Sequence, residues 1–386
     1  MAFPERAAPQ QSRFKDDARN FWHRVSEGLA LNQLWSQFEK DARSSYRLYS
    51  AGLDAAPAEP SRIRRGWQMA KALFWAILEK LTPARRVLLL AALILLFFSS
   101  GGFSYTGRSG HVEVFAFDLH VLGGVLMFVV LLLELADRVV MKRDLEIAKD
   151  IQAWLLPGAP LQIPGYQIAY ATRPANTVAG DYYDVILRPG REPSADRILF
   201  VVADVAGKSI PAAMLMATFQ ASLRTLSTSG VALAELVTGI NHYACSNSQG
   251  GVRFTTAFFA ELEPATGNVA YVNAGHNVPI LRKNSGAIER LESGGIPIGI
   301  LAESAYQMGT TRLEGGDWLV IFTDGVVEAV NQKDMEYGEA ELIAVVNRGS
   351  GVTPAELLRT LLVELDRHVG NTPQHDDITC LLLKRT

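Results

Sequence analysis

The sequence predicts an α+β domain, built from stacked antiparallel sheets with helices outside, that follows an α-helical membrane hairpin. Two stretches, 87–107 and 119–133, contain no Asp, Glu, Lys or Arg and are dominated by large apolar side chains. From Tyr166 onward, short strand-like runs are separated by turns, and helical patterns fall at 210–228, 231–247, 338–347 and 354–369. Strands and helices grouped in this way favour the α+β class.

The composition indicates a folded chain of more than one unit. The 386 residues are 48% hydrophobic and 20% charged, which provides enough apolar surface for a core. The formal net charge of -3 argues against nucleic-acid binding as the main task, although the first 150 residues are net basic and the rest net acidic. The two cysteines, Cys245 and Cys380, share no CxxC spacing, which argues against a disulfide scaffold or a thiolate zinc site.

Residues 1–82 are expected to form a helical region in the cytoplasm or at a membrane interface. Apolar residues recur at helical spacing within 12–50, and 51–61 has the Ala/Pro content of a linker. The segment 66–81 places apolar residues around an arc with lysines beside it, which suits a membrane interface. Soluble helices that pack on one another are the favoured interpretation of 12–50.

Residues 83–137 are predicted to form a two-helix transmembrane hairpin, with spans at 87–107 and 119–136. A helix needs about 20 apolar residues to cross a bilayer. Basic residues crowd both outer ends of this hairpin, whereas the connecting loop carries only Arg108. By the positive-inside rule, this asymmetry places the N-terminus and the C-terminal domain in the cytoplasm. A buried hairpin within a soluble helical domain is the alternative.

Residues 138–157 are predicted to form a helix that connects the hairpin to a domain at 158–386. Ile147, Ile151 and Trp154 lie on one apolar stripe of this helix. Such a stripe packs either on its own domain or on the same helix of a second chain. The second possibility predicts a homodimer through 138–157.

Four acidic motifs stand at the boundaries of the predicted strands. They are VAGDYYD, VVADVAGK, VIFTDGVVEA and PQHDDIT, which contain Asp181, Asp204, Asp324 and the pair Asp376/Asp377. Strand ends at one rim of a sheet bring carboxylates together, and several close carboxylates remain ionised only with cations among them. Oxygen ligands without nearby cysteines or paired histidines favour Mg²⁺ or Mn²⁺ over Zn²⁺. Each motif alone also fits an ordinary turn or helix cap, so the prediction depends on their joint recurrence.

These motifs resemble, in their order, those of the PPM metal-dependent protein phosphatases. NAGHN (273–277) and GIPIG (295–299) stand between the second and the third motif, and the SpoIIE/RsbU-like bacterial branch is the most similar. The resemblance covers about 144–385 and says little about 1–137. It implies a PPM-like αββα sandwich, two antiparallel sheets flanked by helices, with two Mn²⁺ or Mg²⁺ ions at one rim.

The resemblance implies metal-ligating roles for six residues, which are Asp181, Asp204, Val205, Asp324, Asp376 and Asp377. Asp204 would bridge the ions, the carbonyl of Val205 would bind one of them, and Asp324 would hold the pair from the opposite strand. Asp376 or Asp377 would complete the site, with the choice between them open, and Asp181 would bind directly or through water. Asp204 and Asp324 would act in catalysis through the metal-bound hydroxide.

Four neighbouring positions belong to the same motifs. Lys208 is a candidate for binding substrate phosphate, with a solvated surface lysine as the favoured interpretation. His276 is interpreted as a hydrogen-bonded structural histidine in preference to a general acid. The branch usually has glycine where this chain has Ser209 and proline where it has Val278, and both departures fall in loops.

The predicted function is that of a membrane-anchored, metal-dependent serine/threonine protein phosphatase. By resemblance, its substrate is phosphoserine or phosphothreonine on a partner-switching regulator, such as an anti-sigma-factor antagonist. The alternative is a non-catalytic relay that binds a regulatory partner, and the presence of all expected aspartates counts against it. A two-metal nuclease is disfavoured by the acidic domain.

Overall fold

The computed structural model describes residues 71, 74–75, 78–97, 102–106, 112–116, 119–189, 196–247, 253–349 and 351–386. The chain divides into two compact units, Met1–Asp137 and Arg138–Thr386. The predicted helices within 12–50 and the linker at 51–61 lie outside the described residues.

The first unit contains an antiparallel helix pair. Its described elements are α4 (Pro83–Phe97), β1 (Gly102–Thr106), β2 (Val112–Ala116) and the first part of α5 (Leu119–Leu155). Arg85, at the start of α4, pairs with Asp137 of α5 at 2.6 Å. Further along α4, Ala92 is fully buried against α5, where a Cβ at Gly123 would lie only 2.9 Å from its carbonyl oxygen. The two helices therefore approach closely because position 123 has no side chain.

The predicted first span is wrong in its extent. The stretch 87–107 is not one helix, because α4 ends at Phe97 and 102–106 form β1, which pairs antiparallel with β2. Glycine at 101 and 102 disfavours helix, and the aromatic residues that follow favour strand. With 15 residues, α4 is shorter than the about 20 that a bilayer needs.

Helix α5 is longer than either helix predicted within it. It runs without a break through the predicted second span and most of the predicted connecting helix, for 37 residues. Among the residues that the structure describes, α5 is the one helix long and apolar enough to cross a membrane.

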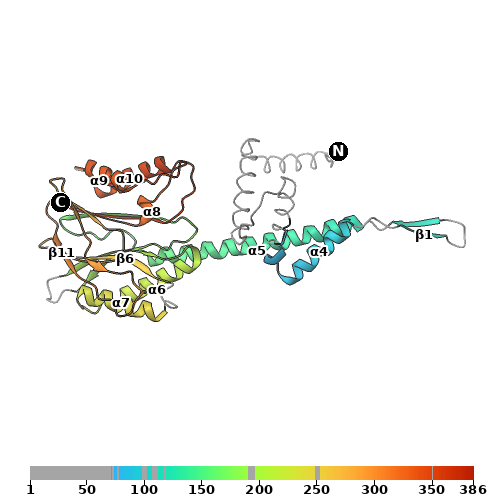
Figure 1. Cartoon of the computed structure of the whole chain (residues 1–386), viewed down its shortest axis with the longest axis horizontal. Helices are drawn as coiled ribbons and strands as arrows, with labels where there is room; N and C mark the ends of the chain where they lie inside the picture. The colour runs from blue at the N-terminus through green and yellow to red at the C-terminus, as the bar shows by residue number, and fades with distance from the viewer. Residues whose placement is uncertain are drawn as a thin grey trace, which may run out of the picture. The chain divides into compact units, whose positions relative to one another are not determined.

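The second unit contains two sheets (Figure 1). The six-stranded sheet has the order β10-β7-β6-β5-β4, with β11 also paired to β7. Its strands are β4 (Tyr182–Arg188), β5 (Arg197–Val205), β6 (Thr255–Glu263), β7 (Asn268–Ala274), β10 (Gly294–Gly295) and β11 (Gly309–Arg312). The five-stranded sheet has the order β3-β13-β12-β8-β9. Its strands are β3 (Tyr166–Arg173), β8 (Ile280–Arg282), β9 (Ile288–Arg290), β12 (Trp318–Phe322) and β13 (Ile378–Arg385).

Helices cover the outer faces of the two sheets, so the second unit has four layers (Figure 1). The helices are α6 (Ser209–Ser227), α7 (Leu233–Asn247), α8 (Asp324–Val327), α9 (Glu339–Arg348) and α10 (Pro354–Val369). The pair α6 and α7 packs on the six-stranded sheet, where Phe219 contacts Phe259. The pair α9 and α10 packs on the five-stranded sheet around Trp318. Among the described strands, every pairing is antiparallel except the two-residue parallel pairing of β10 with β7.

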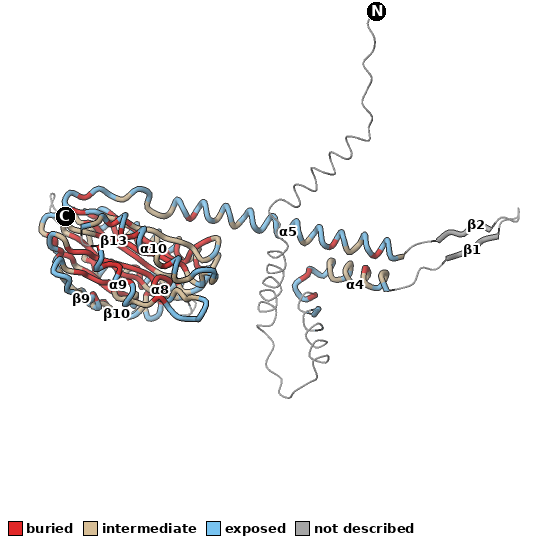
Figure 2. The backbone as a smooth tube through the Cα atoms, turned by 90° about the horizontal axis from the view of Figure 1, so that it is seen from above, coloured by how far each residue is buried: buried red, intermediate tan, exposed pale blue. Residues whose placement is uncertain are grey.

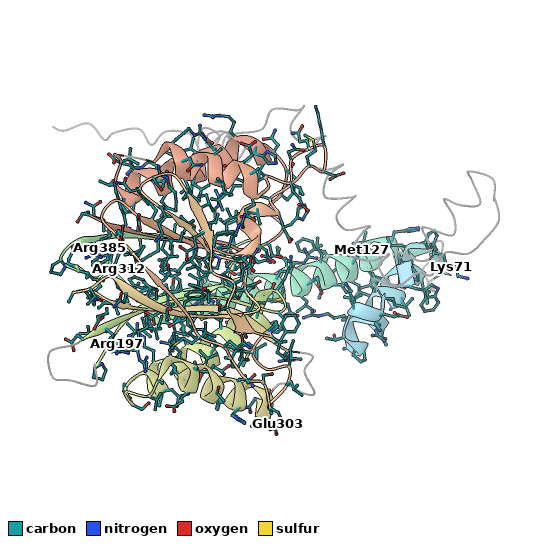
Figure 3. All side chains as sticks on the ribbon, turned by 60° about the vertical axis from the view of Figure 1, so that its left-hand side comes forward. Lys71, Met127, Arg197, Glu303, Arg312 and Arg385 are labelled. Atoms are coloured by element: carbon teal, nitrogen blue, oxygen red, sulfur yellow. The ribbon has the colours of Figure 1, made fainter. Side chains whose placement is uncertain are left out.

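A third apolar cluster fills the space between the sheets, and Figure 2 shows these strands as the buried part of the unit. Phe200 and Phe258 from one sheet and Leu381 from the other are fully buried there. Side chains of both sheets occupy this interlayer (Figure 3). The predicted αββα sandwich is therefore confirmed, since both sheets bury one face against each other and the other face against helices.

Candidate active site

Two candidate ligands come from neighbouring strands of the six-stranded sheet. Strands β4 and β5 are antiparallel, with Tyr182 opposite Ala203, so the start of β4 and the end of β5 lie at the same edge. Asp181 directly precedes β4, and Asp204 is the last residue but one of β5. The register thus brings two carboxylates that are 23 residues apart in sequence to one place.

The five-stranded sheet supplies the other candidates in the same way. Strands β12 and β13 are antiparallel, with Phe322 opposite Cys380. Asp324 follows the end of β12 as the first residue of α8, and Asp376 and Asp377 precede the start of β13. Each sheet therefore presents acidic side chains at an edge where one strand ends and its neighbour begins.

Hydrogen bonds between the sheets join these two edges into one rim. The Thr323 hydroxyl donates to Asp181 Oδ2 at 2.9 Å. The backbone N–H groups of Ala175 and Gly180 donate to the two carboxylate oxygens of Asp377 at 2.7 and 2.6 Å. The loop before Asp181 is therefore attached to the start of β13.

The carboxylates of the rim repel one another. Burial and then the charge of Asp204 raise the pKa of Asp181 well above its usual range. Burial and then the charges of Asp324 and Asp376 raise the pKa of Asp204. Repulsion of this kind is offset when a cation lies among the carboxylates. An all-oxygen donor set of this kind fits a hard divalent cation.

The described side chains do not form a preassembled metal cage. Among the described residues, no group of three or more His, Cys, Asp or Glu side chains is arranged to hold one ion. Asp324 and Asp376 nevertheless lie close enough to Asp204 for their charges to add to the effect of burial and raise its pKa, and the charge of Asp204 acts on Asp181 in the same way. Val205 lies at the end of β5, and a Cβ at Gly180 would lie 3.1 Å from its carbonyl oxygen.

The two aspartates before β13 have different surroundings. The Asp377 side chain is buried and occupied by backbone donors of the loop at 175–180. The Asp376 side chain is 44% exposed and accepts from Lys208 Nζ at 3.0 Å. Asp376 also accepts from the N–H of Asp377 at 3.0 Å, but its side chain is the more exposed of the pair, whereas Asp377 holds a loop.

Lys208 and Ser209 lie at the turn between β5 and α6. The Lys208 ammonium group also donates to the carbonyl oxygen of His375 at 2.5 Å, so it crosses the rim. Burial and then the charge of Asp376 raise the pKa of Asp324, and the charge of Lys208 opposes this rise. Ser209 has a φ of 62°, a backbone conformation in which glycine has no steric cost. Glycine would therefore suit this position better than serine.

His276 is buried beside the rim. Its Nδ1 atom lies 3.0 Å from the hydroxyl of Thr256, which is opposite Asp204 in the sheet. Burial lowers the pKa of His276 to about 4, so the ring is neutral at pH 7. A neutral, buried imidazole fits the structural role and not that of a general acid.

Two residues of the site were not found from the sequence. Thr323 is fully buried, and besides binding Asp181 it accepts from the Thr379 N–H at 3.0 Å. Gln152 of α5 is buried and forms two hydrogen bonds with the backbone of Ala179, at 2.7 and 2.9 Å. The sequence did offer a signal for Gln152, because it is a polar residue among apolar neighbours. It lies on a different face of the helix from the stripe that contains Ile147 and Ile151.

Known proteins share this fold. The SiaA-PP2C domain of Pseudomonas aeruginosa superposes with a TM-score of 0.56 at 20% identity, over 64% of this chain and 98% of that domain. The RsbU and RsbW domains of Rv1364c from Mycobacterium tuberculosis superpose with a TM-score of 0.50 at 24% identity, over 58% and 60% of the two chains. The second unit is therefore a domain of the PP2C-like fold class.

Sequence comparison places the chain within a family. Residues 194–386, half of the chain, match the family model described as Stage II sporulation protein E (SpoIIE). The chain belongs to the SpoIIE family. Phosphoserine phosphatase RsbU of Bacillus subtilis is 26% identical over 245 residues, which are 63% of this chain and 70% of RsbU. Protein IcfG of Synechocystis sp. is 26% identical over 268 residues, and the match spans 63% of this chain but only 41% of IcfG.

Proposed function

We propose that residues 158–386 form a metal-dependent serine/threonine protein phosphatase. The observation that carries this proposal is the rim, where burial and then the charges of neighbouring carboxylates from both sheets raise the pKa values of Asp181, Asp204 and Asp324. A relative that is named a phosphoserine phosphatase supports the same activity. The family and its fold agree with this choice.

The proposed ligands for two Mn²⁺ or Mg²⁺ ions are Asp181, Asp204, Asp324, Asp376 and the carbonyl oxygen of Val205. Of the neighbouring pair we choose Asp376, because the carboxylate of Asp377 is already occupied by two backbone N–H groups. Bound ions would polarise the phosphoryl oxygens and acidify a water molecule.

The chain's own residues orient this donor set. The Thr323 hydroxyl donates to one oxygen of Asp181, which fixes the direction of that carboxylate. Asp377 holds the loop at 175–180 in place, and Gln152 holds the backbone of Ala179 from the other side. Lys208 keeps a positive charge beside Asp376, where an anionic phosphoryl group would enter.

The proposed substrate is phosphoserine or phosphothreonine on a signalling protein, such as an anti-sigma-factor antagonist of a partner-switching system. The support is the relative RsbU, a phosphoserine phosphatase by name. The alternative is a non-catalytic relay that binds the same kind of partner. The two differ in whether a phosphate is released.

Removal of divalent metal tests the activity. The full-length chain in mild detergent should hydrolyse p-nitrophenyl phosphate in the presence of Mn²⁺. Treatment with EDTA should lower the rate of hydrolysis about a hundredfold or more. Added Mn²⁺ should restore the rate, because the carboxylates that hold the ion are unchanged. A chain that never hydrolyses p-nitrophenyl phosphate or phosphoserine peptides with Mn²⁺ or Mg²⁺ would favour the relay.

We also propose that the chain is anchored in a membrane through the apolar part of α5, with the shorter α4 packed against it and both chain ends in the cytoplasm. Large apolar side chains of these helices are exposed, among them Val87, Ile94, Val125, Phe128 and Leu131. The antiparallel packing of the two helices, and the basic residues at both outer ends, support entry and exit on the same side.

Charged substitutions test the anchor. Val125→Lys with Phe128→Lys should release the full-length chain from membranes into an alkaline carbonate wash, because each lysine costs about 2.5–3.5 kcal/mol at the centre of a membrane helix. Val139→Lys with Val140→Lys changes exposed residues of the same helix beyond its apolar part and should leave the chain in the pellet. Equal release of both variants would contradict the anchor.

The third proposal is a homodimer through 138–157. Ile147 and Ile151 are each 48% exposed and Trp154 is 81% exposed, so this stripe does not pack on its own domain. Burial of such a stripe against the same helix of a second chain would stabilise a dimer. In sedimentation velocity, Ile147→Asp with Ile151→Asp should convert a dimer of the full-length chain to a monomer. The control, Lys142→Asp with Lys149→Asp, changes exposed polar positions and should remain dimeric.

A further inference from the structure

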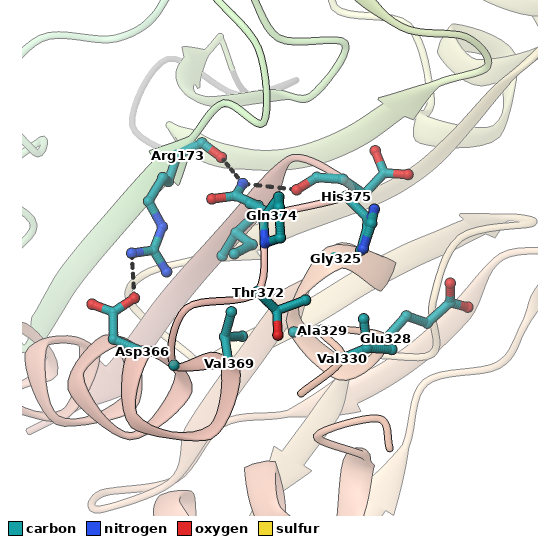
Figure 4. A pocket seen from close by; sticks show the side chains of 14 residues that line it. Arg173, Gly325, Glu328, Ala329, Val330, Asp366, Val369, Thr372, Gln374 and His375 are labelled. Carbon is teal, nitrogen blue, oxygen red and sulfur yellow. Dashed lines mark hydrogen bonds and ion pairs between the residues drawn. The ribbon is translucent and has the colours of Figure 1, made fainter. Parts of the chain in front are cut away.

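A pocket opens beside the acidic rim. Its volume is about 250 Å³, and it lies between α8, the end of α10 and the loop before β13 (Figure 4). Gly325 and Asp376 form part of its wall. The pocket therefore borders the candidate ligands, because its wall includes Asp376 and the residue that follows Asp324.

The lining of the pocket combines apolar and acidic side chains. Ala329, Val330 and Val369 supply apolar surface. The carboxyl groups of Glu328 and Asp366 stand around it together with that of Asp376. The charge of Asp366 is offset by Arg173 and that of Asp376 by Lys208, so Glu328 is the remaining carboxylate that would repel an acidic occupant. An uncharged apolar side chain of moderate size would not be repelled.

Two polar atoms that belong to residues of the lining are buried without a hydrogen-bond partner. They are Nε of Arg173 and the hydroxyl oxygen of Thr372. The guanidinium group of Arg173 is already fixed, because Nη1 donates to Asp366 at 2.6 Å (Figure 4). The guanidinium has five N–H donors, and the buried Nε–H is one that this pairing does not use. A single N–H of a cation whose charge is offset by Asp366 suits a neutral carbonyl acceptor. Buried polar groups of this kind are unfavourable until a partner arrives.

An extended peptide meets both requirements. A phosphoserine whose phosphoryl group lies at the rim has its neighbouring residue one step away, and a chain advances about 3.3–3.6 Å per residue. That residue brings one backbone carbonyl and one side chain to the pocket wall shared with Asp376.

We propose that this pocket is a substrate subsite for the residue next to the phosphorylated serine. It takes an uncharged, apolar side chain against Val330 and Val369. The peptide backbone of this residue accepts from Arg173 Nε and bonds to the Thr372 hydroxyl. Peptides with Asp or Glu at this position are disfavoured. The inference rests on the proposed phosphatase activity and assigns its preferred substrate sequence.

The first test compares substrates and then fills the pocket with a larger side chain. The substrates are p-nitrophenyl phosphate, which has no neighbouring residue, and two sets of phosphoserine peptides with Val or Glu flanking the phosphoserine. For the full-length chain, kcat/KM should be at least tenfold higher for Val-flanked peptides. Val369→Phe should lower kcat/KM for these peptides at least tenfold more than for p-nitrophenyl phosphate. Val363→Phe places the same side chain at an exposed position of the same helix and should show no such difference.

The second test removes a hydrogen bond without changing shape. Thr372→Val keeps the volume of the side chain and removes an unpartnered hydroxyl, so it should not lower thermal stability. It should raise KM for Val-flanked peptides several-fold with little change in kcat. An unchanged KM, equal rates for Val- and Glu-flanked peptides, or equal behaviour of the Val369→Phe and Val363→Phe variants would overturn the subsite. If no probe is hydrolysed, the proposed phosphatase activity itself fails, which is a distinct outcome.

Discussion

Replacement of Asp204 by asparagine is expected to reduce Mn²⁺-dependent phosphatase activity on the order of a thousandfold. Asp204 lies in the middle of the rim, and its pKa is raised by burial and then by the charges of Asp324, Asp376 and Asp377. Asparagine keeps the shape but removes the negative charge that would hold a divalent cation. Initial rates at saturating Mn²⁺, with p-nitrophenyl phosphate as substrate, measure the loss.

The same variant should show a second effect that does not depend on turnover. Without metal, it should be at least as stable as the wild type, because one source of repulsion among buried carboxylates is gone. Mn²⁺ at a hundred times its dissociation constant should stabilise the wild type by about 2.7 kcal/mol and the variant much less. Thermal melting with and without Mn²⁺ reports this difference.

Asp196→Asn is the matched control for Asp204→Asn. Asp196 is exposed and directly precedes the opposite end of the same strand, β5. The control should match the wild type in activity and in its response to Mn²⁺. Full activity of the Asp204→Asn variant would remove Asp204 from the proposed metal site.

Replacement of Gly325 by alanine should damage the site without changing any candidate ligand. Gly325 is buried, and a Cβ there would collide with the carbonyl oxygen of Asp377 and lie 2.9 Å from its carbonyl carbon. The backbone at Asp377 must then move, and with it the loop at 175–180 that this residue holds. We expect a loss of about 1–3 kcal/mol in stability, as for other overpacked sites, and a severe loss of activity.

Gly315→Ala is the control for this steric effect. A Cβ at Gly315 meets no atom within 4 Å, and its φ does not require glycine. This variant should retain activity and lie within about 0.5 kcal/mol of wild-type stability. The comparison uses melting temperatures and initial rates of the full-length chains. Equal stability of the Gly325→Ala and wild-type chains would show that the turn at α8 accommodates a side chain.

Much of the second unit could be predicted from local patterns. The strand-like runs predicted from Tyr166 onward include β3 to β7 and β12, and the helices predicted at 210–228, 231–247, 338–347 and 354–369 correspond to α6, α7, α9 and α10. Period-two and period-3.6 apolar patterns report which face of an element is buried, and these elements are long enough to show them. Strands β8 to β11 were not predicted, because runs of two to four residues carry too little pattern.

The membrane-proximal part shows a limit of hydropathy. The lack of charged residues joined α4 to the residues that form β1, because neither the end of the helix nor the strand contains Asp, Glu, Lys or Arg. It also divided α5 at charged residues that the helix passes through without a break. Charge changes the surroundings that a helix prefers, but it does not end the helix.

The sequence by itself determined that acidic residues stand at strand ends, because strand patterns and aspartates are both local features. Only the tertiary structure distinguished Asp376 from Asp377, which are adjacent and chemically identical. The difference arises because Asp377 receives N–H groups from residues about 200 positions earlier, whereas Asp376 faces Lys208 and solvent. The roles of Thr323 and Gln152 were likewise decided by partners remote in sequence. A hydrogen bond across two sheets depends on their packing, and no local pattern of residues specifies it.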